Sequence, residues 1–234
     1  MSEVLDYFSA HDKATMAAFQ TQGIGRYLTS SPQDVRQLTP QEVKDAHDLG
    51  LSIHLFYEMN PTYLAYFTFA QGAEDCRQAQ ARLAELGAPD GTVVYFTVDT
   101  NVGPEMIVEY FNGIESSQTP AITPGIYGYQ RMCEYADKNF PAMGKHLWQT
   151  YGSRIIRLDG WQHLQENRAG VSVDVNEVTV PGWKGADMTD EQVRAIIADY
   201  LANTYGPALE AELTQRQGQA VADAVKAAGV KLSA

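Results

Sequence analysis

TVVYFTVD, at residues 92–99, predicts a buried β-strand that ends in a carboxylate. Every residue before Asp99 is β-branched or aromatic, and the turn-forming pair Asp90-Gly91 stands directly in front of the segment. Helical patterns lie on either side, at about residues 70–86 and 104–118. Because short apolar runs that alternate with helical patterns are typical of βαβ units, this part of the chain predicts an α/β fold.

The same alternation extends over most of the chain. Seven further strands are expected, at residues 4–7, 24–28, 51–57, 125–128, 145–149, 160–163 and 171–175. Further helices are expected at about residues 12–21, 39–50 and 130–140. In the second of these, Thr39 is an N-cap, Pro40 opens the first turn and Glu42 completes a capping box. Five strand–helix units followed by three strands fit a closed, TIM-like α/β barrel better than an open sheet.

The last part of the chain departs from this rhythm. We expect the barrel to occupy residues 1–186 and a helical C-terminal extension to occupy residues 187–234. An apolar helical stripe starts at Val193, and Gly206-Pro207 separates it from a second helix rich in Ala and Gln. The extension can pack on the barrel and fray at its end. Alternatively, it can join copies of the chain, or attach the barrel to a partner in an assembly such as a virion.

Composition and charge exclude several classes of protein. The chain of 234 residues is 44% hydrophobic and 20% charged, unlike a disordered tail, a collagen-like fibre or a disulfide scaffold. Its 17 basic and 29 acidic residues give a net charge of −12, which disfavours nucleic acid and membrane surfaces as partners. Cys76 and Cys133 are expected to be free, buried thiols. With no signal-peptide pattern and no apolar run of membrane-spanning length, we expect synthesis in the cytoplasm and any export by another route.

Carboxylates stand at the ends of four of the expected strands. They are Asp6, Glu58, Asp99 and Asp174. In a parallel barrel the C-terminal ends of the strands meet at one mouth, so these four are the candidate catalytic residues. The candidate substrate-binding residues at the same strand ends are Tyr57, Tyr127, Trp148, Gln149, Trp161 and Gln162. Aromatic faces, amides and paired carboxylates suit a carbohydrate, because crowding keeps one carboxyl protonated beside an ionised neighbour.

Other chemistries are poorly supported. The chain has no phosphate-binding G-x-x-x-x-G-K-[ST], no G-x-G-x-x-G after a strand and no G-x-S-x-G. Its five histidines form no H-E-x-x-H, and His54 and His146 fit hydrogen-bonded wall positions within strands. No D-x-D-x-D-G loop is present, so we expect neither a metal nor a cofactor.

An ordered set of short motifs identifies a family resemblance. The motifs are GRYL at 25–28, LTPQE at 38–42, VYFTVD at 94–99, PGIYG at 124–128, LWQ at 147–149 and VDVN at 173–176. Over about residues 3–185 the chain resembles the glycoside-hydrolase-like domain once catalogued as domain of unknown function 1906, a relative of the glycoside hydrolase family 25 lysozymes. The resemblance implies a barrel of five strand–helix units and three further strands, with peptidoglycan glycan strands as the substrate. It also implies that Asp6, Asp99 and Asp174 are the strand-end acids of the family.

The chain departs from the family 25 pattern at one position. Those lysozymes carry Asp-x-Glu after the fourth strand, where this chain has Asp99-Thr100-Asn101, and Asn101 cannot donate a proton as a carboxylic acid does. Two hypotheses follow. Either Glu58 is the general acid of a muramidase-like hydrolase, such as a phage endolysin or tail component that a holin or virion delivers to the cell wall. Or the barrel, with Asn101 among its binding residues, holds wall glycan without cutting it and serves as a module of a larger assembly.

Overall fold

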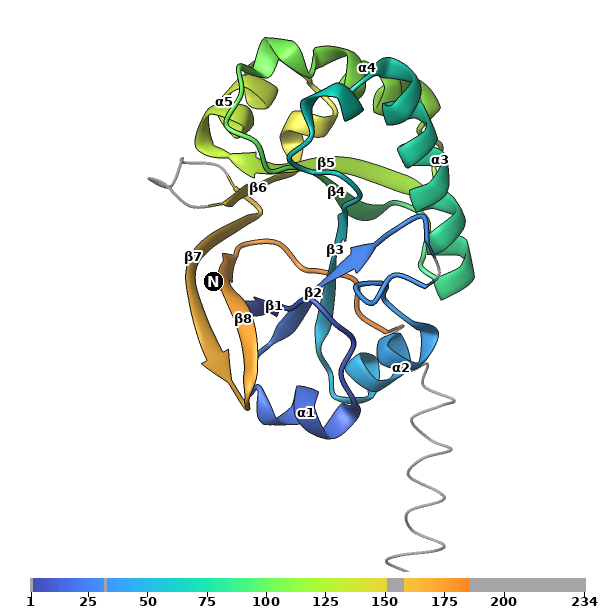
Figure 1. Cartoon of the computed structure of the whole chain (residues 1–234). Helices are drawn as coiled ribbons and strands as arrows, with labels where there is room; N and C mark the ends of the chain where they lie inside the picture. Colours follow the sequence, from blue (N-terminus) through green and yellow to red (C-terminus); the bar gives the residue numbers. More distant parts are fainter. Residues whose placement is uncertain (1, 32, 151–157, 186–234) are drawn as a thin grey trace, which may run out of the picture. The chain divides into compact units, whose positions relative to one another are not determined.

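Eight strands close into one barrel, in the order in which they occur along the chain (Figure 1). The structure is a computed structural model that describes residues 2–31, 33–150 and 158–185. The strands are β1 (Ser2–Asp6), β2 (Gly23–Leu28), β3 (Ser52–Tyr57), β4 (Thr92–Val98), β5 (Ile122–Tyr129), β6 (Leu147–Thr150), β7 (Gly160–Arg168) and β8 (Val171–Val178). Strands β1 to β7 pair in parallel, and β8 closes the barrel antiparallel to both β7 and β1. The predicted TIM-like α/β barrel is therefore confirmed.

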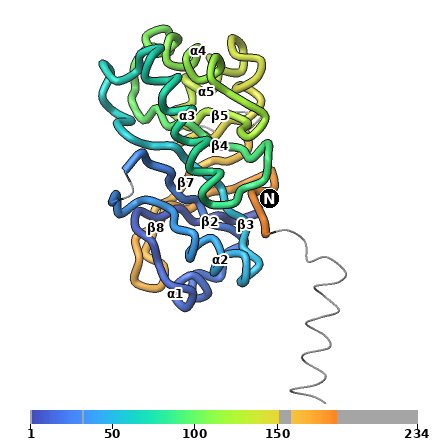
Figure 2. The backbone as a smooth tube through the Cα atoms, turned by 90° about the vertical axis from the view of Figure 1, so that its right-hand side faces the viewer, coloured from blue at the N-terminus to red at the C-terminus, as the bar shows by residue number. Residues whose placement is uncertain are grey.

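Helices follow each of the first five strands. They are α1 (Lys13–Ala18), α2 (Pro40–Asp48), α3 (Phe69–Leu86), α4 (Val108–Ser117) and α5 (Gln130–Asn139), with short 3₁₀ turns η1 (Leu64–Tyr66), η2 (Pro104–Met106) and η3 (Met143–Lys145). Figure 2 shows α3, α4 and α5 gathered around β4 and β5, while α1 and α2 lie beside β2 and β3. The expected helix at 104–118 is in fact η2 followed by α4.

The start of α2 agrees with its sequence only in part. The Thr39 side chain accepts a hydrogen bond from the Glu42 N–H at 3.2 Å, as an N-cap does. The capping box is not completed, because the Glu42 carboxylate turns inward and accepts from Arg26 Nε at 2.8 Å and from the Tyr7 hydroxyl at 3.0 Å. The prediction for Glu42 was wrong because Arg26, a buried residue of the mostly apolar strand β2, binds the Glu42 carboxylate instead.

Side chains alternate between the barrel axis and the helix layer, as they must on a strand. Val4, Phe56, Tyr95, Trp148 and Val178 pack together inside the barrel. The alternate positions pack under the helices in a larger cluster, which includes the free, buried thiols of Cys76 and Cys133. The expectation for both cysteines is therefore confirmed.

The end of the barrel differs in length from the prediction. β7 and β8 run on as a hairpin to the pair Arg168↔Val171, whose turn uses Ala169 and Gly170 with φ of 53° and 84°.

The chain divides into two units at Gly185 and Ala186. The predicted C-terminal helices at 187–234 lie outside the described residues. In the part that is described, no helix combines the length and apolar character needed to cross a membrane.

Candidate active site

The four predicted carboxylates lie at the same end of the barrel. Asp6 is the last residue of β1 and pairs with Asp174 across the β1–β8 ladder. Glu58 and Asp99 directly follow β3 and β4. Their negative charges interact: Asp174 and Glu58 raise the pKa of Asp6, and Asp99 raises those of Glu58 and Asp174. The barrel thus holds four acids at its C-terminal mouth, close enough to oppose one another's ionisation.

Asp6 forms the buried floor of this mouth. Only 3% of the residue is exposed. Its two carboxylate oxygens accept hydrogen bonds from the Tyr27 hydroxyl at 3.0 Å and from Asn176 Nδ2 at 2.9 Å. Burial, followed by the charge of Asp174, raises the pKa of Asp6 to about 7 despite these two bonds. Asp6 therefore changes its protonation state near neutral pH.

Glu58 is the acid at the edge of the mouth. Its side chain is 20% exposed, and its Oε1 accepts from Arg36 Nη1 at 2.8 Å. Arg36 is held in turn by Asp34, through Nε at 3.1 Å and Nη2 at 2.8 Å. Burial raises the pKa of Glu58 more than the Arg36 charge lowers it, and the charges of Asp99 and Asp34 act in the same direction as burial.

Asp99 and Asp174 are the two remaining acids of the mouth, and each accepts hydrogen bonds from neighbouring side chains. Burial raises the pKa of both, while hydrogen bonds from Tyr129 to Asp99 and from Gln165 and Gln162 to Asp174 partly oppose the rise. Gln165 Nε2 lies 2.9 Å from Asp174 Oδ1. Gln162 also accepts hydrogen bonds from the hydroxyls of Tyr127 and Thr150. A chain of hydrogen bonds thus links β5, β6, β7 and β8 beneath the acids.

Two of the predicted substrate-binding residues belong to this mouth. Burial and the negative charges of Asp6, Asp99 and Asp174 raise the pKa of Tyr127. Its hydroxyl donates a hydrogen bond to Gln162 inside the barrel. Asn101 lies exposed in the loop that follows β4.

The other four predicted substrate-binding residues do not line the mouth. Tyr57 points into the helix layer, where its hydroxyl donates to Gln78 of α3 at 2.7 Å. Gln149 is fully buried and follows Trp148, whose side chain faces inward, so the Gln149 side chain faces the helix layer. Trp161 pairs with Gln149 in the β6–β7 ladder and therefore faces the same way, and it packs against the cluster under the helices. Trp148 faces inward, but it is fully buried and its Nε1 donates to Asn176 at 2.9 Å. The structure thus places these four side chains away from the mouth, because neighbouring residues on a strand face opposite sides and because the Trp148 ring is buried in the interior.

The structure adds residues that sequence reasoning missed. Tyr27 and Asn176 hold Asp6, Arg36 holds Glu58, and Tyr129 bonds to Asp99. Asn176 could have been found, because it stands two positions after Asp174 and therefore shares its face of β8. Arg36 could not, because it reaches Glu58 from a loop whose path no local pattern predicts.

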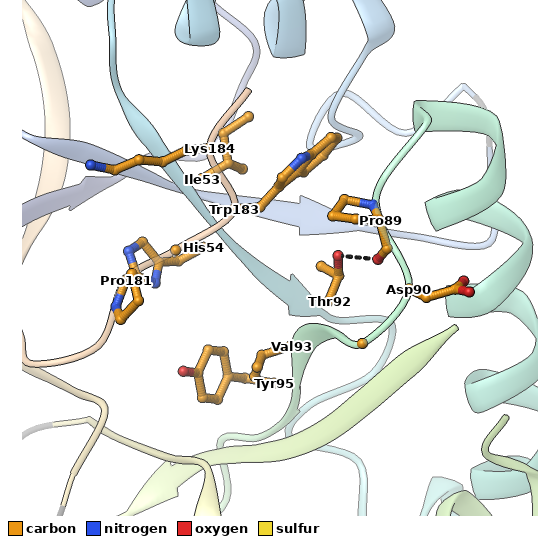
Figure 3. A pocket seen from close by; sticks show the side chains of 12 residues that line it. Ile53, His54, Pro89, Asp90, Thr92, Val93, Tyr95, Pro181, Trp183 and Lys184 are labelled. Atoms are coloured by element: carbon orange, nitrogen blue, oxygen red, sulfur yellow. Dashed lines mark hydrogen bonds between the residues drawn. The ribbon is translucent and has the colours of Figure 1, made fainter. Parts of the chain in front are cut away.

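A pocket of about 290 Å³ opens at the opposite end of the barrel (Figure 3). It lies at the N-terminal ends of β3 and β4, where Ile53, His54, Thr92, Tyr95, Trp183 and Lys184 are among the residues that line it. His54 is buried with a pKa lowered to about 4 by desolvation, and Ser52 Oγ lies 3.4 Å from its Nε2. His146 Nδ1 lies 2.9 Å from Asp159 Oδ2. His54 lies within β3, as expected, whereas His146 directly precedes β6 and does not lie within a strand. This end of a TIM-like barrel ordinarily serves stability.

Among the residues that the structure describes, no group of three or more His, Cys, Asp and Glu side chains could hold a metal ion.

Replacing Asp6 by asparagine is expected to stabilise the barrel at neutral pH. The asparagine Oδ1 can still accept from Asn176 Nδ2, and its Nδ2 can donate to the Tyr27 hydroxyl oxygen, but the side chain carries no charge toward Asp174. Because the pKa of Asp6 is 3.8 in its ordinary state and about 7 in the fold, the folded parent binds the extra proton between these values, and its stability falls as pH rises through this window.

At about 1.4 kcal/mol per pKa unit, the difference in unfolding free energy between Asp6→Asn and the parent should grow by on the order of 3 kcal/mol from about pH 4 to about pH 7. Urea unfolding at both pH values measures this difference. A difference that shrinks as pH rises would contradict the raised pKa that burial and the charge of Asp174 give to Asp6.

A closed barrel of five strand–helix units and three further strands, with carboxylates at its C-terminal mouth, has the architecture of a glycoside-hydrolase-like domain. Residues 14–221 match the family described as Rv2525c-like, glycoside hydrolase-like domain, and the chain belongs to this family. The family resemblance inferred from the sequence motifs is therefore confirmed.

Three known proteins place the chain among relatives. The uncharacterized protein YbfG of Bacillus subtilis (strain 168) is 32% identical over an alignment of 127 residues, and the match covers 47% of this chain and 17% of that protein. The chain thus spans less than a fifth of this curated relative. The Tat-secreted protein Rv2525c of Mycobacterium tuberculosis, in complex with HEPES, matches with a TM-score of 0.67 and 22% identity over 78% of this chain and 97% of that one. GHIP, a glycosyl hydrolase 25 of Streptococcus pneumoniae, matches with a TM-score of 0.52 and 8% identity over 76% and 87%. The two solved structures show the shared fold.

Proposed function

We propose that this protein is a glycoside hydrolase that cleaves the glycan strands of peptidoglycan, with Glu58 as its general acid. The observation that carries the proposal is the set of four carboxylates at one mouth, all with pKa values raised by burial. Clustered titratable groups with opposed ionisation are typical of catalytic sites. Membership of a glycoside hydrolase-like family and the fold shared with a glycosyl hydrolase 25 support the choice of a glycan as substrate.

Access decides which carboxyl can donate the proton. Burial raises the pKa of Asp6 to about 7, but this carboxyl is almost completely buried and both of its oxygens already accept hydrogen bonds. Glu58 is more exposed, and its second oxygen can face a glycosidic oxygen while Arg36 holds Oε1. The raised pKa of Glu58 favours the protonated form that a general acid requires.

The remaining acids would stabilise positive charge. Glycoside cleavage passes through a transition state with oxocarbenium character, and an ionised carboxylate beside it lowers its energy. Asp99 follows the strand next to that of Glu58 and interacts with it, so we assign Asp99 to this role or to orienting an N-acetyl group. Asp6 and Asp174 complete the acidic floor. Delivery to the wall by a holin or a virion is part of the same proposal.

A second function is favoured by one observation. Asn101 stands where the family 25 lysozymes carry the glutamate of Asp-x-Glu, and an asparagine cannot protonate a leaving group. On this alternative the barrel binds wall glycan without cutting it.

The decisive experiment incubates the full chain with purified peptidoglycan sacculi and measures new reducing ends. We expect release by the parent and by Asp90→Asn, a control that removes a carboxylate from the turn at the opposite end of the barrel. Asn101→Glu should change the rate less than about tenfold, because Glu58 already supplies the acid. A silent parent that Asn101→Glu makes active would contradict our proposal and support the binding alternative.

A further inference from the structure

Four exposed apolar side chains stand on the loops that follow β1, β2, β3 and β4. They are Phe8, Val35, Tyr63 and Met106, with exposed fractions of 64%, 62%, 64% and 53%. We call this set the apolar rim. Among the described residues, only Phe69 and Leu164 join them as large, exposed hydrophobic side chains. A single exposed apolar residue needs no explanation, but four on consecutive loops at one end of a barrel indicate a binding surface.

Hydrogen bonds tie these four loops side by side. Arg26 donates from Nη1 to the Tyr7 carbonyl at 2.7 Å and from Nη2 to the Arg36 carbonyl at 3.1 Å, which joins the first loop to the second. The Arg36–Glu58 ion pair joins the second loop to the third. The Asp99 N–H donates to the Pro61 carbonyl at 2.9 Å and joins the third loop to the fourth. The four loops that carry the rim residues are therefore neighbours, in the order of their strands.

The loops that carry the rim begin at the acidic mouth. Phe8 stands two residues after Asp6, Val35 is next to the arginine that holds Glu58, and Tyr63 lies on the loop that Glu58 begins. A ligand that extends from the acids over the loops of β1 to β4 is therefore expected to meet the rim.

We infer that the apolar rim binds the sugar rings of a neutral, N-acetylated glycan strand that lie beyond the ring held at the acids. This inference rests on the proposed function and extends its binding surface. A sugar ring has an apolar face of C–H groups and a polar edge of hydroxyls, so it suits an apolar side chain set among polar neighbours. Val35 is flanked by Asp34 and Arg36, and Met106 follows Glu105.

Charge selects among possible polymers. The loops of the rim carry Asp34, Glu58, Asp99 and Glu105 against the single arginine Arg36, which pairs with Asp34 and Glu58, so their net charge is negative and would repel an anionic wall polymer. A neutral N-acetylglucosamine chain is not repelled, and its acetyl methyl groups give Val35 and Met106 an apolar contact.

The experiment titrates N-acetylglucosamine oligomers, from the trimer to the hexamer, into the full chain by calorimetry. We expect the parent to bind the hexamer about tenfold more tightly than the trimer, since each aromatic contact contributes about 0.5–1.5 kcal/mol. The double variant Phe8→Ser with Tyr63→Ser should lose this length dependence and keep the parent's affinity for the trimer. Leu164→Ser is the matched control, because it removes a 46%-exposed apolar residue of β7 outside the rim.

The outcomes separate the rim from the proposed cleavage. If the double variant keeps the length dependence, the inference that the rim binds glycan is overturned. It is also overturned if the parent is a dimer in solution and the double variant is a monomer. Rim-dependent binding without release of reducing ends from sacculi keeps the rim and contradicts cleavage. Cleavage that proceeds with no binding difference between parent and double variant keeps the proposed function and overturns the rim.

Discussion

Replacing Glu58 by glutamine is expected to lower the rate of glycan cleavage by roughly 10²- to 10⁴-fold, the usual contribution of a general acid. Glutamine has the same shape, and its carbonyl oxygen can still accept from Arg36 Nη1, which lies 2.8 Å from the glutamate oxygen. What is lost is the dissociable proton. The variant should therefore fold as the parent does and bind glycan, while failing to protonate the leaving oxygen.

The pH dependence of the parent adds a second readout. Because burial raises the pKa of Glu58, the protonated acid persists to higher pH than an exposed glutamate would allow, and activity should fall as pH rises through that raised value. In Glu58→Gln this alkaline limb should disappear from the residual activity.

Reducing-end release from sacculi, measured over a pH series, tests both expectations. Glu105→Gln is the matched control, since it makes the same chemical change on the exposed loop after β4. Parent-like rates in Glu58→Gln would remove Glu58 from the mechanism. Equal losses in Glu58→Gln and Glu105→Gln would indicate that the charge of the loops matters, and proton donation does not.

The architecture was predictable because its signals are local. β4 occupies Thr92–Val98 as expected, since its apolar run is continuous and a turn bounds it. The convergence of the acids also followed from local information, because a residue at the end of a parallel strand must lie at the mouth whatever its neighbours do.

The surroundings of the acids were predicted less well, because they depend on which face a residue takes. Tyr57 and Glu58 are adjacent, so they cannot both face the mouth, and only the closed barrel shows that Tyr57 bonds to Gln78 of the helix layer. Trp148 has the aromatic face that a sugar requires, yet it fills the barrel interior and bonds to Asn176. The Arg36–Glu58 ion pair joins two different loops, and the spacing of residues within either loop does not predict it.

Replacing Glu42 by glutamine is expected to lower the free energy of unfolding by about 3–5 kcal/mol, the effect of breaking a buried ion pair on one side. The side chains of Arg26 and Glu42 are 0% and 2% exposed, and Nε lies 2.8 Å from Oε1. The neutral glutamine leaves the Arg26 charge in the core with no opposite charge beside it. The Arg26 charge would remain out of contact with water and would have no opposite charge to compensate it. The loss of unfolding free energy should therefore exceed that caused by removing any surface ion pair.

The consequence of this loss reaches the candidate active site. Arg26 also donates to the carbonyls of Tyr7 and Arg36, so it holds the loop after Asp6 and the loop whose arginine binds Glu58. Urea unfolding measures the stability, and Asp48→Asn is the control, because its pairs with Lys13 and Lys44 are solvent-exposed and their removal should leave the midpoint unchanged. A midpoint for Glu42→Gln equal to that of Asp48→Asn would show that the buried pair does not stabilise the barrel.

If the pair does hold the two loops, Glu42→Gln should also weaken glycan binding under conditions in which the variant remains folded. The reason is that Arg26 positions Arg36, and Arg36 positions Glu58.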